Sequence, residues 1–274
     1  MTLIAAFRCN EGMVLCADQQ ETIGIHRVSV NKLSPRRYGE YALAIAGSGE
    51  GYLVDGFADK LGRVIQAWPT GVDESSARES ITTALLDFHT NEVNLYPTTP
   101  NDDKLCSFVV CITPKTEDRT FLWQIHGTVI LPIERHVLIG VYEAIYNHEL
   151  RRLYRDRLSM NQAMLLGIHL FSIAKATSTY IGGNTDIIAV LNHRMLSFDA
   201  DEVRALEQHI GSFNERIASL VLAAPDYDMT KTEFEQLLKD FEQQVIELRA
   251  HYPEEGHPDR GLTAVQCIDW HGED

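Results

Sequence analysis

The sequence predicts an α+β fold, a four-layer αββα sandwich in which two antiparallel sheets pack face to face and helices cover both outer surfaces. The order of the segments is the main evidence, because a group of strand-like runs is followed by two helical patterns, and this order then occurs again. Such grouping is typical of antiparallel sheets with helices packed outside them. The chain has 274 residues, 45% of them hydrophobic, which is enough to bury a large core.

The first group of strands lies at the N-terminal end of the chain. Apolar or alternating runs predict strands at 3–9, 13–18, 26–33 and 41–46. Residues 10–12, Asn-Glu-Gly, predict the hairpin turn between the first two strands, and the Ser-Pro pair at 34–35 is expected to end the third. Two helices are expected next, at 51–68 and 75–95, because apolar residues recur there on one helical face.

A second group of strands and helices follows in the same order. Apolar runs predict strands at 105–113, 119–126 and 136–140. A helix is expected to start just after Gly140, and a second helix is expected at 160–180. Residues 185–191 then predict another strand.

Residues from about 195 to 260 predict a helical insertion before a closing strand. Helical patterns cover 201–222 and a segment after Thr230, where Thr230 and Glu233 have the spacing of a capping box. The apolar run at 262–268 predicts a strand that returns to the sheet. We therefore expect a single domain over 2–274, with the helical pair packed on the sandwich or on a neighbouring subunit.

Thr2 directly follows Met1, so removal of Met1 would leave a threonine with both a hydroxyl and a free amine. An N-terminal amine has a pKa of about 7.7–8.0, so part of it is unprotonated near neutral pH. Such an amine can take the hydroxyl proton while the oxygen attacks a carbonyl. Threonine at position 2 alone is weak evidence, so the hypothesis depends on the residues that follow.

Three further positions support a catalytic role for Thr2. Asp18 ends the second expected strand, Lys32 lies near the end of the third, and Gly47 begins a glycine turn after the fourth. Such a turn can present backbone N–H groups to an oxyanion, because glycine tolerates close approach and unusual dihedral angles. Each residue also has a purely structural explanation, as a turn cap, a solvated charge or a hairpin glycine.

Thr2, Asp18, Lys32 and Ala46-Gly47, in this order and at this spacing, resemble the proteasome β-subunit family, which includes a simpler bacterial ATP-dependent peptidase. The resemblance implies the N-terminal nucleophile hydrolase form of the αββα sandwich and a threonine peptidase that needs no cofactor. It also implies a homo-oligomeric ring that degrades peptides or unfolded proteins, and an ATPase unfoldase as a partner.

The resemblance further implies a role for each residue. The Thr2 hydroxyl would attack, and the Thr2 amine would act first as base and then as acid. A charged Lys32 would lower the pKa of both Thr2 groups, and Asp18 would pair with Lys32 and orient it. Ile45 and Gln20 would line a substrate pocket.

Two later segments depart from the pattern of the family. Val141 stands where a serine near the threonine amine is usual, and Ser178 and Ile181 occupy positions that usually carry an aspartate and a serine. These changes would alter the hydrogen bonds around the amine and could reduce or abolish activity. Two alternatives therefore stay open: a proteasome-like scaffold subunit without proteolysis, and a small-molecule amidase on the same fold.

The composition argues against several other classes. A net charge of −15 without a compensating block of Lys and Arg argues against binding to nucleic acid. Neither a signal-peptide pattern nor an apolar run of membrane-spanning length is present, and an odd number of cysteines, five, indicates reduced thiols in a cytoplasmic protein. The cysteines and the 11 histidines lack metal-site spacing, so no metal is expected.

Overall fold

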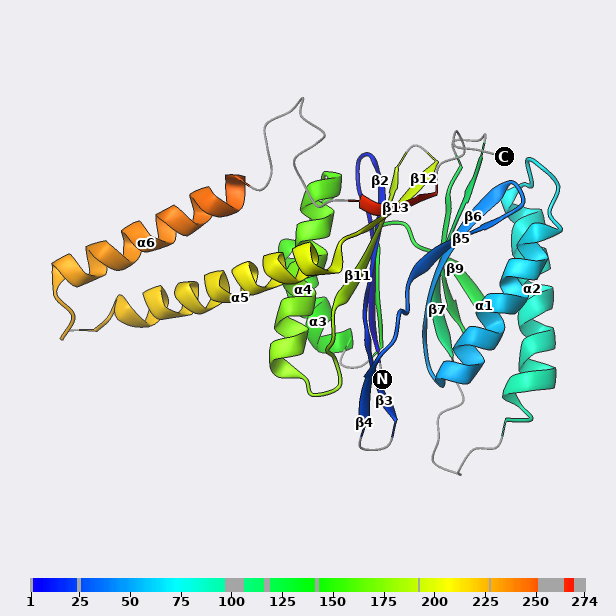
Figure 1. The fold of residues 1–274 in the computed structure, drawn as a ribbon, viewed down its shortest axis with the longest axis horizontal. Coiled ribbons are helices and arrows are strands. Elements are labelled where there is room, and N and C mark those ends of the chain that lie inside the picture. Colours follow the sequence, from blue (N-terminus) through cyan, green and yellow to red (C-terminus); the bar gives the residue numbers. More distant parts are fainter. Residues whose placement is uncertain are drawn as a thin grey trace.

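The computed structural model describes residues 2–23, 26–96, 106–115, 119–140, 143–191, 193–226, 228–250 and 264–268. Two antiparallel sheets pack face to face, and helices lie on both outer sides (Figure 1). This arrangement is the αββα sandwich that the sequence predicts.

The first sheet has six strands in the order β10-β1-β2-β11-β12-β13. They are β1 (Leu3–Arg8), β2 (Gly12–Asp18), β10 (His136–Gly140), β11 (Thr185–Leu191), β12 (Arg194–Phe198) and β13 (Ala264–Ile268). Helices α3 (Glu143–Leu153) and α4 (Met160–Thr177) cover its outer face.

The second sheet has five strands in the order β5-β6-β7-β8-β9. They are β5 (Ser34–Tyr38), β6 (Tyr41–Ser48), β7 (Ser107–Pro114), β8 (Phe121–His126) and β9 (Val129–Pro132). Helices α1 (Gly51–Gln66) and α2 (Glu74–Phe88) cover its outer face, and α2 continues into a π-helical turn, His89–Val93. A separate hairpin, β3 (Gln20–Ile23) with β4 (His26–Ser29), leaves the end of β2.

Strand β1 illustrates how the core is divided into layers. Leu3, Ala5 and Phe7 pack with the helices outside the first sheet, whereas Ile4 and Ala6 pack in the layer between the two sheets. Both faces of the strand are buried because side chains alternate between the two sides. A one-residue slip would exchange these two sets of side chains, so the register of β1 with β2 is strongly specified.

The segment between β2 and β6 differs from the expected one. A single strand at 26–33 is wrong, because β4 ends at Ser29 and a further strand, β5, begins at Ser34. The Ser34-Pro35 pair therefore begins a strand and does not end one. Proline is tolerated there because β5 is the edge strand of its sheet, where a missing N–H donor leaves no partner unsatisfied.

Helices α5 (Ala200–Ala223) and α6 (Lys231–Ala250) form an arm that extends away from the sandwich (Figure 1). Only the start of this arm packs firmly: Val203, Leu206 and Ile210 of α5 are buried against α4, whereas no residue of the fully described α6 is buried. Among the described helices, including this pair, none is both long and apolar enough to cross a membrane. We propose that the arm is a helical insertion in a single domain spanning 2–274.

A buried polar cluster attaches the arm to the first sheet. Lys175 of α4 donates to both carboxylate oxygens of Glu207 on α5, each at 2.8 Å, and to the hydroxyl of Thr185 on β11, also at 2.8 Å. The Thr185 hydroxyl donates to Glu207 as well. Because Thr185 lies opposite Asp18 in the sheet register, the base of the arm is joined to the strand that ends in the candidate site.

Candidate functional site

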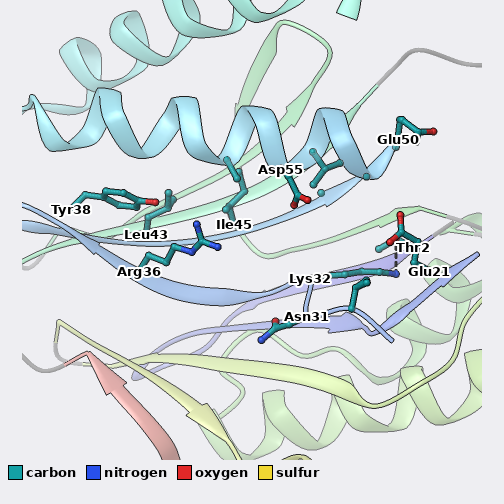
Figure 2. A pocket seen from close by; sticks show the side chains of 16 residues that line it. Thr2, Glu21, Asn31, Lys32, Arg36, Tyr38, Leu43, Ile45, Glu50 and Asp55 are labelled. Carbon is teal, nitrogen blue, oxygen red and sulfur yellow. Dashed lines mark hydrogen bonds between the residues drawn. The ribbon is translucent and has the colours of Figure 1, made fainter. Parts of the chain in front are cut away.

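The structure brings Thr2, Lys32 and Asp18 together at one end of the first sheet. Figure 2 shows the hydrogen bond between Lys32 and Thr2. The Lys32 ammonium donates to Thr2 Oγ1 at 2.9 Å and to Asp18 Oδ1 at 3.2 Å. It also donates to the backbone carbonyl of Gln20 at 2.5 Å. An ammonium has three N–H donors, so these three acceptors fix the position of Lys32.

The strand pairing explains why residues distant in sequence meet here. Antiparallel pairing of β1 with β2 places Asp18, at the end of β2, beside the first residues of β1. The Leu3 backbone N–H accordingly donates to Asp18 Oδ1 at 2.9 Å. The β3–β4 hairpin then returns the chain, and Val30 N donates to the Gln19 carbonyl at 2.8 Å. Lys32 therefore arrives next to Asp18.

Asp18 is fully buried and, besides the Lys32 ammonium, receives backbone N–H donors from three segments. Besides the Leu3 N–H, the Gln20 N–H donates to Oδ2 at 3.1 Å and the Gly182 N–H donates to it at 3.4 Å. Burial raises the pKa of the Asp18 carboxyl above its usual value, while the Lys32 charge and the backbone donors oppose this shift. Asp18 thus serves as the fixed counter-charge of Lys32.

The environment of Lys32 makes its proton easier to remove than that of a surface lysine. Its side chain is only 10% exposed. Burial lowers the pKa of the Lys32 ammonium, and the charge of Asp18 opposes this shift. At neutral pH an ammonium in direct contact with the Thr2 hydroxyl favours loss of the hydroxyl proton, because it stabilises the resulting negative charge.

Replacement of Asp18 by alanine is expected to lower the free energy of unfolding by about 3–5 kcal/mol, because it leaves the Lys32 ammonium buried without its counter-charge. Urea unfolding of the wild type and of Asp18→Ala measures this difference. Asp59→Ala is the matched control, since Asp59 pairs with Arg36 at an exposed position. The control should change stability by less than about 1 kcal/mol. Equal, small effects of both substitutions would contradict the assignment.

Gly47 lies inside strand β6, and not in the turn predicted from the sequence. It pairs with Phe108 of β7, and the turn comes at Gly49, which has a φ of 145°. A side chain at Gly47 would be too close to its neighbours, because a Cβ would stand 2.5 Å from Val54 Cγ1. Tight packing between β6 and α1 is therefore one reason for glycine at this position.

Gly47 nevertheless borders the candidate site. The register of β5 with β6 ends where Ser34 meets Ile45, so within the described residues β5 does not cover the edge of β6 beyond that point. Gly47 lines the same cavity as Thr2. That the Gly47 backbone N–H donates a hydrogen bond to an oxyanion at this open edge remains a prediction.

The positions that depart from the expected pattern serve structural roles. The Ser178 hydroxyl accepts a hydrogen bond from the Tyr180 backbone N–H at 3.1 Å, just after α4 ends. Ile181 is buried among the apolar residues between the first sheet and its helices. Val141 lies outside the described residues, as does Met1.

A cavity of about 440 Å³ opens beside Thr2, between α1 and strands β5 and β6 (Figure 2). Ile45 lines this cavity, as the sequence resemblance implies, whereas Gln20 does not. The Gln20 amide instead donates to the Thr179 carbonyl at 3.0 Å. The sequence reasoning missed four charged residues of the cavity, Glu21, Arg36, Glu50 and Asp55. No local sequence signal marks them, because only the folded chain brings the β3–β4 hairpin, β5 and α1 to one site.

Comparison with protein families and with curated proteins finds no match to this chain. Solved structures do match its fold. Anbu (Gly-1 mutant) from Hyphomicrobium sp. strain MC1 has a TM-score of 0.66 and 16% identity, covering 84% of this chain and 100% of its own. Anbu (ancestral beta-subunit) from Yersinia bercovieri gives 0.63 and 14%, covering 83% and 100%. A structure entitled "Helical Assembly of the Anbu Complex from Pseudomonas aeruginosa" gives 0.64 and 14%, covering 82% and 97%.

The chain has the fold of the Anbu proteins. The resemblance to the proteasome β-subunit family and the bacterial ATP-dependent peptidase is therefore wrong as a family assignment, because the matching structures are those of the proteasome-like but distinct Anbu proteins. The error has a physical reason: Thr2, Asp18, Lys32 and Gly47 mark the strand layout of a shared fold, and four positions do not separate families with that layout. At 14–16% identity, the likeness to Anbu also establishes the fold alone.

Proposed function

We propose that this protein is a hydrolase that cleaves peptide bonds with Thr2 as its N-terminal nucleophile, after removal of Met1. One observation carries the proposal: the Lys32 ammonium lies 2.9 Å from Thr2 Oγ1 and 3.2 Å from Asp18. A nucleophile in contact with an activating group, which a third residue holds in place, is the usual arrangement in nucleophilic catalysis. The proteasome-like fold supports the same reading.

The proposed reaction begins with attack of Thr2 Oγ on the substrate carbonyl carbon. The Thr2 amine takes the hydroxyl proton, and Lys32 stabilises the negative charge that develops on Oγ. The Gly47 N–H stabilises the oxyanion of the tetrahedral intermediate. The amine then gives the proton to the departing nitrogen, which leaves an ester on Thr2. Water hydrolyses this ester, with the amine again acting as base, and frees the carboxylic acid product.

Intact mass and peptide hydrolysis, measured on the same preparation, test this proposal. We expect the purified chain to have lost Met1 and to hydrolyse fluorogenic peptides. A control preparation that keeps one extra residue before Thr2 should be inactive, because its Thr2 nitrogen is an amide and not an amine. Equal hydrolysis by both preparations would contradict the proposal.

Asp186 lies on β11, opposite Ala17 in the sheet register and therefore next to Asp18. Replacement of Asp186 by asparagine is expected to lower the pH at which activity falls on the alkaline side. Lys32 loses its proton as pH rises, and burial makes this happen below the ordinary lysine value of about 10.4. The charge of Asp186 raises the pKa of Lys32, so its removal should move the alkaline fall in kcat/KM to lower pH. Asp201→Asn, at an exposed position on α5, is the control and should leave the profile unchanged. An unshifted profile in Asp186→Asn would indicate that the charge of Lys32 is not needed.

A scaffold without proteolysis is the second candidate. It is favoured by Ser178 and Ile181, whose side chains serve a local turn and the core and supply no described contact to Thr2. Such a scaffold would assemble normally but would not hydrolyse peptides after loss of Met1. The mass and hydrolysis measurements above therefore also separate the two candidates.

We also propose that the chain assembles with copies of itself. One matching structure is described as a helical assembly, which supports this proposal. The arm offers exposed apolar side chains for contacts, among them Val221 and Leu222. Sedimentation velocity should find a particle larger than one chain. A ring, an ATPase unfoldase, unfolded protein substrates and a cytoplasmic location remain predictions.

A further inference from the structure

We propose that the cavity beside Thr2 selects substrates with a cationic side chain of the lysine or arginine type next to the bond that is cleaved. This inference rests on the proposed function, since it names the substrate class of the same site. It depends on the charges, the shape and the apolar surface of the cavity.

The charged side chains of the cavity that lack a close partner of opposite charge are carboxylates. Glu21 and Asp55 both line it, and neither carboxylate forms a hydrogen bond or a close ion pair within the part of the chain that the structure describes. The charge of Glu21 nevertheless acts on Lys32, whose pKa it raises, so Asp55 is the carboxylate of the two without such a counter-charge. Glu50 lines it too, and its carboxylate accepts a hydrogen bond from Tyr96. A carboxylate next to a cavity without a counter-charge attracts a cation.

Both cations of the cavity already have acidic partners. Lys32 is paired with Asp18 at 3.2 Å. Arg36 is paired with Asp59 at 3.4 Å, although both side chains of this pair are exposed. The charge left for a substrate is therefore negative. The net charge of −15 on the whole chain acts in the same direction.

Asp55 is placed to meet the end of a long side chain. Figure 2 shows it extending from α1 toward the strands, at a different place along the cavity from Thr2. Glu21 lies closer to Thr2, and its carboxylate stands against Gly51 at the start of α1, where a Cβ would be 2.5 Å from Glu21 Oε1. Because the N-terminus of a helix compensates negative charge, Glu21 is the more satisfied of the two. Asp55 is thus the principal partner for a substrate cation.

The apolar part of the cavity suits the stem of a lysine or arginine. Leu43, Ile45 and Val54 line it together with the charged residues. The methylene groups of lysine and arginine pack on apolar surface while the charged end stays polar. The cavity volume of about 440 Å³ also lies within the range of small-molecule sites.

Binding to the Thr2→Ala protein tests selectivity without turnover. Three fluorescent peptide amides that differ only in their last residue, Arg, Leu or Glu, would be titrated and followed by fluorescence anisotropy. We expect the Arg peptide to bind at least about 10-fold more tightly than the other two. Asp55→Asn in the same background should remove most of this preference. The control Glu79→Gln changes an exposed carboxylate of α2 that does not line the cavity, and it should leave the preference intact.

Equal binding of the three peptides would overturn the inference. Tightest binding of the Glu peptide would also overturn it and would make Arg36 the dominant charge. The failure of the inference differs from that of the proposed function. Hydrolysis by wild type that depends on Thr2 but shows no cationic preference refutes only the inference. Selective binding of the Arg peptide without any hydrolysis by wild type supports the inference and refutes the function.

Discussion

Replacement of Thr2 by alanine is expected to abolish peptide hydrolysis, with a loss of at least about 10⁴-fold in kcat. The substitution removes the oxygen that attacks the carbonyl, and no other described hydroxyl contacts Lys32. Fluorogenic peptide hydrolysis measures the effect. Thr2→Ser is the matched variant, because serine keeps both a hydroxyl and an N-terminal amine, and it should retain a measurable fraction of the activity.

The loss in Thr2→Ala should not come from unfolding. Thr2 is buried, and its described side-chain hydrogen bond is the one from Lys32. Loss of one hydrogen bond changes the free energy of unfolding by about 1 kcal/mol, so the urea midpoint should move little. Thr2→Ala protein that unfolds like wild type and still hydrolyses peptides at the wild-type rate would eliminate Thr2 as the nucleophile.

Replacement of Lys32 by alanine is expected to lower kcat/KM by about 10²–10⁴-fold. The change removes the positive charge in contact with Thr2 Oγ1, so the hydroxyl returns to its ordinary, weakly acidic state. The same hydrolysis assay measures the loss. Arginine should not replace Lys32, because a planar guanidinium cannot occupy the site where a compact ammonium meets three acceptors.

Two controls separate the chemical effect of Lys32 from a structural one. Lys231→Ala removes an exposed lysine of α6 and should leave the rate unchanged. Urea unfolding at the temperature and pH of the assay shows whether the Lys32→Ala protein is folded there. Rates are compared under those conditions. A folded Lys32→Ala protein with wild-type activity would show that the contact with Thr2 has no catalytic role.

The sequence predicts the sandwich because its central strands are buried on both faces. Runs such as 3–8 and 185–191 have few polar residues, so their strand character does not depend on a particular alternation. The Thr2–Asp18 proximity follows from the short turn between β1 and β2. Strand β5 was not predicted, since its Ser-Pro-Arg-Arg-Tyr sequence is typical of a loop and forms a strand only by pairing with β6.

The site could be predicted only as far as local patterns reach. The pairing of Lys32 with Asp18 was implied by the family resemblance, and the two side chains do lie 3.2 Å apart. The hairpin that carries Lys32 there, 20–29, was not predicted, because a single strand at 26–33 was expected. Gly47 was assigned to a turn because closely spaced glycines usually mark turns. In the structure it lies in β6, where the close approach of Val54 leaves little room for a side chain. Asp55 could not be identified, because an acidic residue on a helix is ordinary until the opposite wall of the cavity is known.

Mass-spectrometric mapping of a covalent adduct tests the central claim most directly. The reagent is an electrophile that reacts only when a hydroxyl and an amine belong to the same residue. We predict an adduct on Thr2 in chains that have lost Met1, and no adduct in Thr2→Ala. An adduct on another residue, such as the Cys9 thiol, or no adduct on chains proven to begin at Thr2, would contradict the assignment of Thr2 as the nucleophile.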